Sequence, residues 1–112
     1  MDKNLKMVRG DTLSFGLEIE GLGQDLDTCY FSCKLNPDDT NYVFQKSLNS
    51  GISKVSTGKY RVRVAPSDTS NVEVGNYYYD LQIGVNGDIF TIIKGVLIIE
   101  REISRWFYEY KN

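Results

Sequence analysis

Residues 72–83 read Val-Glu-Val-Gly-Asn-Tyr-Tyr-Tyr-Asp-Leu-Gln-Ile, and this stretch does most to decide the fold. From Tyr77 onward, every second side chain is large and apolar or aromatic, which is the period of a strand with one buried face. Gly75 lies two residues before Tyr77, where the chain enters this strand. A tyrosine just inside a strand that follows a crossing loop can return its hydroxyl to the loop backbone. This tyrosine corner is typical of immunoglobulin-like (Ig-like) sandwiches, so we expect Tyr77 and Gly75 to be structural residues.

Alternation with period two continues along most of the chain. It predicts strands over residues 12–20, 28–35, 42–48, 52–55, 59–65, 77–83 and 89–99. The strand over 52–55 is short enough to be an edge strand, and residues 66–71 have room for one helical turn. Strands at intervals of about 8–12 residues are typical of a sandwich or barrel. The sequence therefore predicts an all-β, Ig-like Greek-key β-sandwich of seven to eight antiparallel strands.

The same alternation assigns side chains to the two faces of each strand. On 59–65 three cations, Lys59, Arg61 and Arg63, face outward, which indicates a solvated or edge-protecting surface. Lys46 interrupts the inward face of its strand. The side chains expected to face inward in the middle of the chain are Cys29, Phe31, Cys33, Leu35, Tyr42, Phe44, Leu48, Tyr60, Val62 and Val64.

Two glycine positions indicate how the last long hairpin is built. Asn86-Gly87 is a strong signal for a two-residue type I′ turn, which needs a positive φ at both residues. Gly95 interrupts the β-branched strand that follows, and we expect a bulge there.

Composition excludes several classes of function. The chain has 112 residues, 13 Lys+Arg against 15 Asp+Glu, and no histidine. A balanced charge argues against a nucleic-acid partner and against a polybasic membrane surface. The absence of histidine removes the commonest general base and metal ligand. We expect one Ig-like domain over residues 1–104, a non-enzymatic role, and no catalytic residue, cofactor or metal.

The two cysteines predict the redox environment. On a strand, Cys29 and Cys33 would share a face with their Cα atoms about 13 Å apart. A disulfide needs Cα atoms closer than about 7 Å. We therefore expect buried free thiols, in a protein that folds in a reducing cytoplasm.

Other short motifs carry weaker signals. Arg9-Gly10-Asp11 matches an adhesion tripeptide, but it lies between predicted strands and suits a tight connection. Asp25 and Asp27, like the Asp38-Asp39 pair, offer oxygen ligands without the spacing of a calcium loop. We interpret both acidic pairs as solvated loop residues.

The end of the chain, residues 105–112, departs from the alternating pattern. Aromatic residues and arginine are enriched at binding hot spots, so one hypothesis makes this tail an interface with another copy or another protein. The other interpretation is that the tail folds back over its own sandwich. The interface residues of the first hypothesis are Arg105, Trp106, Phe107, Tyr108 and Tyr110.

Several stretches together resemble a known family. Val8–Phe15, Leu26-Asp27, Thr57–Val62 and Gly75–Leu81 are similar to the N-terminal Ig-like domain of phage baseplate upper proteins and related virion accessory proteins, over about residues 6–100. The resemblance implies a bacteriophage structural or assembly protein of the tail, baseplate or capsid, made in the bacterial host cytoplasm and located in the virion. It implies other virion proteins or further copies of the chain as partners.

Two alternative classes remain. A carbohydrate- or host-surface-binding module would use exposed Tyr30, Tyr78 and the tail aromatics as a platform on which sugars stack, with a host surface glycan as partner. A repeat cut from a longer bacterial surface protein would also have an Ig-like pattern, but the initiator methionine and the lack of a signal peptide argue against it.

Overall fold

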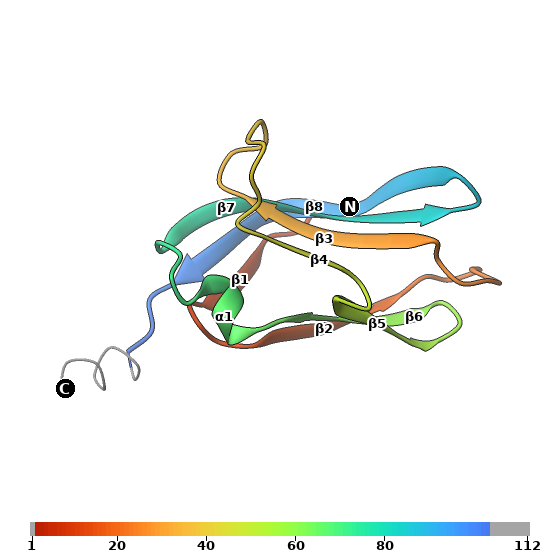
Figure 1. Ribbon diagram of the computed structural model, residues 1–112, viewed down its shortest axis with the longest axis horizontal. Coiled ribbons are helices and arrows are strands. Elements are labelled where there is room, and N and C mark those ends of the chain that lie inside the picture. The colour runs from red at the N-terminus through yellow and green to blue at the C-terminus, as the bar shows by residue number, and fades with distance from the viewer. Residues whose placement is uncertain (1, 104–112) are drawn as a thin grey trace.

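The computed structural model describes residues 2–103, which form eight strands and one short helix in two layers (Figure 1). Helical periodicity is nearly absent from the sequence, and the single turn of helix begins at a proline, whose fixed φ suits a first helical position. The elements are β1 (Leu5–Val8), β2 (Leu13–Glu18), β3 (Thr28–Lys34), β4 (Phe44–Leu48), β5 (Gly51–Ser56), β6 (Lys59–Val64), α1 (Pro66–Thr69), β7 (Gly75–Val85) and β8 (Asp88–Glu100).

The strands follow one another in the order β1-β8-β7-β3-β4-β5-β6-β2. β1, β8, β7, β3 and β4 make one layer, and β5, β6 and β2 make the other (Figure 1). The layers are connected where β4 meets β5 through only two register pairs, Ser47 with Gly51 and Leu48 with Ile52. In the strand order β5 lies between β4 and β6, and the outermost strands are β1 and β2. Only Gly51 and Ile52 of β5 pair with β4, so the rest of this short strand has β6 as its single neighbour, as an edge strand would.

Two of the strand pairings are parallel, whereas the sequence predicted antiparallel strands throughout. β4 and β5 pair parallel where the chain changes layer, and β1 pairs parallel with the end of β8. The remaining pairings are antiparallel. β1 and β8 lie at opposite ends of the chain, so local turn signals could not reveal their pairing. β4 and β5 are separated by only two residues, and their short parallel contact forms where the chain changes layer.

Gly95 allows the N-terminal segment to approach β8 and is not the site of a bulge. Leu81 pairs with Ile93 and Gln82 pairs with Thr91, so Ile92 is the extra residue of a bulge. The bulge therefore lies three residues before Gly95. At Gly95 a Cβ atom would overlap the carbonyl of Lys3. The glycine is needed for this close backbone approach.

An aromatic cluster around Phe31 fills the centre of the sandwich. The Phe31 side chain is fully buried. Its ring centroid lies 5.4 Å from that of Phe15, 5.7 Å from Phe44 and 5.6 Å from Tyr79. Because β2, β4 and β7 each contribute one ring, this cluster joins both layers at the middle of β3.

Two residues expected to face inward are exposed. Leu35 is 53% exposed and Tyr42 is 47% exposed. β3 ends at Lys34, one residue before the predicted strand ends, and the chain then turns through Asn36 to Asp39. The alternation therefore stops at Lys34, and residues 35–43 form a loop that stands away from the sheet (Figure 1).

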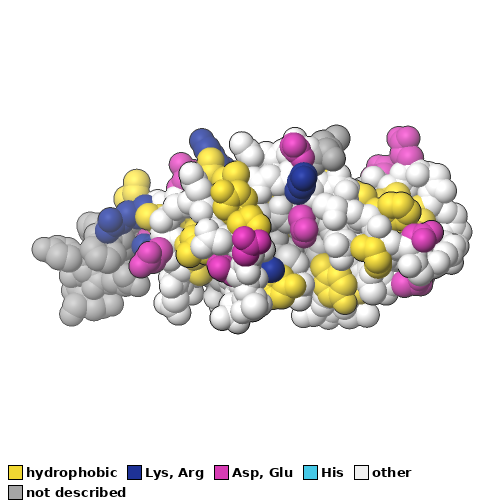
Figure 2. All heavy atoms as spheres, turned by 90° about the horizontal axis from the view of Figure 1, so that it is seen from above, with side chains coloured by type: hydrophobic (Ala, Val, Ile, Leu, Met, Phe, Trp, Pro, Cys, Tyr) yellow, Lys and Arg dark blue, Asp and Glu magenta, His cyan; other side chains and the backbone are white. Residues whose placement is uncertain are grey.

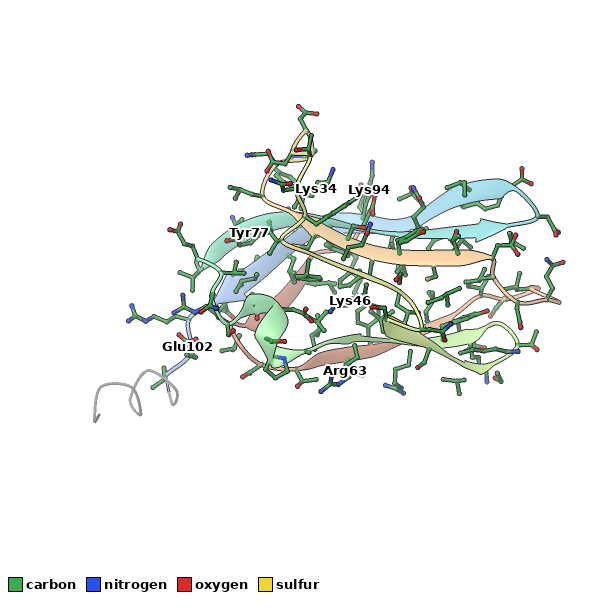
Figure 3. The ribbon with its side chains drawn as sticks, viewed as in Figure 1. Lys34, Lys46, Arg63, Tyr77, Lys94 and Glu102 are labelled. Atoms are coloured by element: carbon green, nitrogen blue, oxygen red, sulfur yellow. The ribbon has the colours of Figure 1, made fainter. Side chains whose placement is uncertain are left out.

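Lys46 lies between the two layers (Figure 3), at the position where the sequence breaks the inward face of β4. Its ammonium lies 2.7 Å from both carboxylate oxygens of Asp68 on α1. Asp68 also accepts a hydrogen bond of 2.7 Å from the backbone N–H of Ala65. The lysine therefore ties β4 to the segment that connects β6 with β7.

The turn and corner residues adopt special conformations. The Tyr77 hydroxyl donates to the Glu73 carbonyl at 2.5 Å, which is the geometry of a tyrosine corner. Gly75 has a φ of 149°, a conformation that favours glycine. Asn86 and Gly87 have φ values of 54° and 84°, as a type I′ turn requires.

Candidate functional site

The candidate site is a groove of about 900 Å³ on the outer face of β4, β3, β7 and β8, which we call the outer groove. Its floor consists of outward side chains of these strands, and hydrophobic, basic and acidic groups alternate on this face (Figure 2). The side chains considered below are Tyr30, Ser32, Lys34, Tyr42, Gln45, Tyr78, Asp80, Gln82 and Lys94.

A polar row crosses the middle of the outer groove. In the strand register, Ser32 of β3 lies opposite Gln45 of β4 on one side and Asp80 of β7 on the other. Asp80 in turn lies opposite Lys94 of β8. The Gln45 amide donates a hydrogen bond of 3.0 Å to the Ser32 hydroxyl, so amide, hydroxyl, carboxylate and ammonium groups follow one another across four strands.

Tyrosines lie on either side of this polar row. Tyr30 is two residues before Ser32 on β3, opposite Gln82. Tyr78 is two residues before Asp80 on β7, opposite Lys34, and is 48% exposed. Tyr30 is half-buried, and both tyrosines line the groove next to a polar neighbour.

The β3–β4 loop makes one wall of the outer groove. Pro37 and Tyr42 of this loop line it. The ammonium of Lys34 lies 5.0 Å from the centroid of the Tyr42 ring, within cation–π range. Tyr42, wrongly predicted to be part of the core, thus belongs to the candidate site.

The N-terminal segment lines the other side of the outer groove, through Asp2 and Asn4. The backbone N–H of Val96 donates 3.1 Å to the Asn4 side-chain oxygen, and that of Lys3 donates 2.8 Å to the Lys94 carbonyl. The Tyr79 hydroxyl donates to the Lys3 carbonyl. These bonds hold the segment against β8.

Asp80 is the acidic group at the centre of the outer groove. Partial burial raises the pKa of its carboxyl above the ordinary value, and the nearby Lys34 ammonium opposes this shift. Within residues 2–103, the Asp80 carboxylate makes no hydrogen bond and no ion pair. Its acceptor oxygens are therefore available to a ligand.

The acidic residues considered as calcium ligands have other roles in the structure. The Asp25 carboxylate lies 2.7 Å from the Lys54 ammonium. Asp27 accepts from the backbone of Asn86 at 2.9 Å, and Asp39 accepts from that of Asn36 at 3.1 Å. Within the part of the chain that the structure describes, no three His, Cys, Asp or Glu residues cluster in a way that would hold a metal ion.

The Arg9-Gly10-Asp11 tripeptide connects β1 to β2, and each of its residues makes a contact within the sandwich. The Asp11 N–H donates 3.0 Å to the Val8 carbonyl. The Arg9 guanidinium binds both carboxylate oxygens of Glu102, at 2.6 Å to the nearer one. The Gly10 N–H donates 2.8 Å to the fully buried Thr69 hydroxyl. The motif therefore fastens the end of β8 to the sandwich.

The tail hypothesis concerns residues beyond those that the structure describes. Its residues, Arg105, Trp106, Phe107, Tyr108 and Tyr110, lie outside the described residues. Among the described residues, no helix is long and apolar enough to cross a membrane.

Sequence reasoning found Tyr30 and Tyr78 but missed the polar residues between them. The sequence did contain one signal. The outward positions of β3 and β7 carry a mixture of serine, lysine, aspartate and glutamine, whereas an ordinary solvated face would carry charged residues of similar kind. Their meaning depends on the register between strands that are about 50 residues apart in the chain, and alternation within one strand does not contain that register.

Comparison with known proteins gives similarity in structure only. The sequence matches no protein-family model and no curated protein. The NK cell receptor NKp44, a triggering partner in natural cytotoxicity, has a TM-score of 0.54 at 12% identity, with 89% of this chain and 99% of that chain covered. The extracellular domain of the voltage-gated sodium channel beta4 subunit, whose parallel homodimers explain its role in cell–cell adhesion, has a TM-score of 0.46 at 12% identity, with 91% and 93% covered.

The fold is an Ig-like β-sandwich. In antibody domains, a buried tryptophan packs against a disulfide between the two sheets. In this Ig-like chain, Phe31 and its three ring partners fill the centre. Cys29 and Cys33 are buried free thiols on β3.

Proposed function

We propose that this protein is a non-enzymatic structural or assembly component of a bacteriophage virion. The observation that supports it is the layer change between β6 and β7. Two stretches that carry the resemblance, Thr57–Val62 and Gly75–Leu81, lie on β6 in one layer and on β7 in the other. This is the order of strand, crossover and returning Gly-x-Tyr strand that the resemblance implies.

In this role the sandwich is a rigid body that presents binding surfaces. Its partners are other virion proteins or further copies of the chain, and it needs no cofactor. It is made in the host cytoplasm and ends in the virion, which suits its two free thiols. Residues 105–112 supply part of the contact, through the aromatic side chains of the tail.

Mass spectrometry of purified particles tests this function. We expect peptides of this chain at constant stoichiometry in particles of the parent phage, and their loss when the gene is deleted. Absence of the chain from particles of a phage that expresses it would contradict the proposal.

Truncation separates the tail hypothesis from the function as a whole. A chain ending at residue 104 should keep its unfolding midpoint as a monomer and enter particles less efficiently than the full chain. If truncation instead lowers the free energy of unfolding by several kcal/mol and leaves incorporation per folded chain unchanged, the tail covers its own sandwich.

A second candidate function is recognition of the host surface. It is favoured by one observation, that Tyr30 and Tyr78 line the same outer groove with the polar side chains of Ser32 and Asp80 between them.

A further inference from the structure

We propose that the outer groove binds an extended, uncharged oligosaccharide, an activity beyond assembly of the virion. The groove has the combination that sugar recognition needs, with aromatic rings beside hydrogen-bonding side chains.

The polar groups of the outer groove complement hydroxyls. A sugar hydroxyl both donates and accepts, and the polar row offers acceptors, donors and groups that do both. Asp80 accepts only, Lys94 donates only, and the Gln45 amide does both. Asp80 has no hydrogen-bond partner of its own among residues 2–103, so binding costs it no existing contact.

The aromatic rings are spaced for more than one sugar unit. Tyr30 lies four positions along β3 from Lys34, and Lys34 lies opposite Tyr78. At about 3.3 Å per residue, the backbones of the two tyrosines are therefore roughly 13–15 Å apart. Ser32 and Asp80 lie between them, so an extended ligand would meet a ring, a polar row and a second ring in turn.

The charges of the outer groove balance. Lys34 and Lys94 point away from the sandwich on the same outer face (Figure 3), and the acidic residues that line the groove with them are Asp2 and Asp80. Two positive and two negative groups give no net attraction for a polyanion, which would require a cationic surface. This balance favours an uncharged ligand.

The shape is concave, as small-ligand sites usually are. The β3–β4 loop and the N-terminal segment stand on two sides of the floor. A protein partner typically places apolar anchors in a desolvated centre. Here the centre is polar and the apolar surface consists of separate rings, an arrangement suited to sugar rings, which have C–H faces and polar edges.

The test is an array of neutral oligosaccharides of three to six hexose or N-acetylhexosamine units, followed by titration calorimetry of each positive probe with the full chain. Tyr78→Ala and Asp80→Asn should each weaken binding at least tenfold. Arg63→Ala, on the outer side of the other layer (Figure 3), should leave affinity unchanged. Unfolding midpoints of all variants confirm that each is folded at the titration temperature.

Three outcomes would overturn the proposal. The first is the absence of binding to any neutral probe at millimolar concentration by the folded parent chain. The second is binding that Tyr78→Ala, Tyr30→Ala and Asp80→Asn all leave intact. The third, seen when an anionic polysaccharide is titrated alongside the neutral probes, is binding to that polymer alone that is lost in Lys34→Ala. Because incorporation into particles is measured separately, failure here leaves the virion proposal standing.

Discussion

Lys46 keeps its charge at an inward position of β4 because its ammonium meets both oxygens of the Asp68 carboxylate. The lysine side chain is 16% exposed and the aspartate side chain 17% exposed, so water screens the pair only in part. A second bridge, between Lys54 and Asp25, has the same 2.7 Å separation, but its side chains are 43% and 62% exposed. The two bridges differ mainly in burial, which makes them a matched pair.

Lys46→Ala should lower the free energy of unfolding by about 1–3 kcal/mol, because it leaves a half-buried carboxylate without its cation. Lys54→Ala should change it very little, because water screens an exposed surface bridge. Urea midpoints of the two variants check this order. Equal losses would show that Lys46 contributes no more than a solvated pair.

Tyr77→Phe removes only the hydroxyl that binds the Glu73 carbonyl. We expect a loss of about 1–3 kcal/mol, because that partly buried carbonyl loses its donor. Tyr78→Phe, on the exposed face of the same strand, is the control and should change the midpoint very little. If both variants unfold at the parent midpoint, the corner adds nothing to stability.

The two buried thiols should make the free energy of unfolding depend on pH in the alkaline range. Burial raises the pKa of Cys29 from 9.0 to about 11 and that of Cys33 to about 12. Well below pH 9 both states keep the thiols neutral, so these groups add no pH dependence there. Above pH 9 the unfolded chain loses protons that the folded chain retains, and the free energy of unfolding falls until about pH 12.

Thermal midpoints between pH 8 and pH 11 check this expectation. Burial also raises the pKa values of the Tyr77 and Tyr79 hydroxyls, which adds to the fall in the same direction. Cys33→Ala removes one titrating group and should show a shallower decline relative to its own value at pH 8. A decline as steep as that of the parent would mean that other groups cause it.

At the scale of elements, strands with one buried face were predictable, and strands with weak alternation were predicted less well. β3, β6 and β7 alternate cleanly, and their bounds lie within about two residues of the prediction. The face of β4 was misread at Tyr42, since no local signal shows where a strand leaves the sheet. The parallel pairing of β1 depends on Gly95, whose role appears only when Lys3 lies against it.

Gly95→Ala tests this close approach. The added methyl group would overlap the Lys3 carbonyl, so we expect a loss of about 1–3 kcal/mol and displacement of the N-terminal segment. Faster amide exchange at Val96, which donates to Asn4, would report the displacement. Gly23→Ala is the control, because a Cβ there meets no atom within 4 Å. A Gly95→Ala variant with parent stability and exchange would contradict the assignment.

At the scale of the whole molecule, the period of the hydrophobic pattern was enough to predict a two-layer sandwich. It was not enough to predict the outer groove, because the groove needs the register among four strands and the positions of two flanking segments. Tyr30 and Tyr78 were identified because outward-facing aromatic residues of a strand are recognisable one at a time. Asp80 and Lys94 were missed because a charged residue on an outward face is ordinary until its neighbours are known.

The parallel pairing of β1 with β8 has a mechanical consequence. Tension applied at residues 2 and 103 would draw β1 backward along β8, in shear. The pairs from Leu5 with Leu97 to Val8 with Glu100 would then carry load together, whereas a hairpin pulled from its open end breaks one pair at a time. The bidentate contact of Arg9 with Glu102 lies at the end of this seam and would share the load. A domain connected in this way resists stretching beyond what its equilibrium stability alone would suggest.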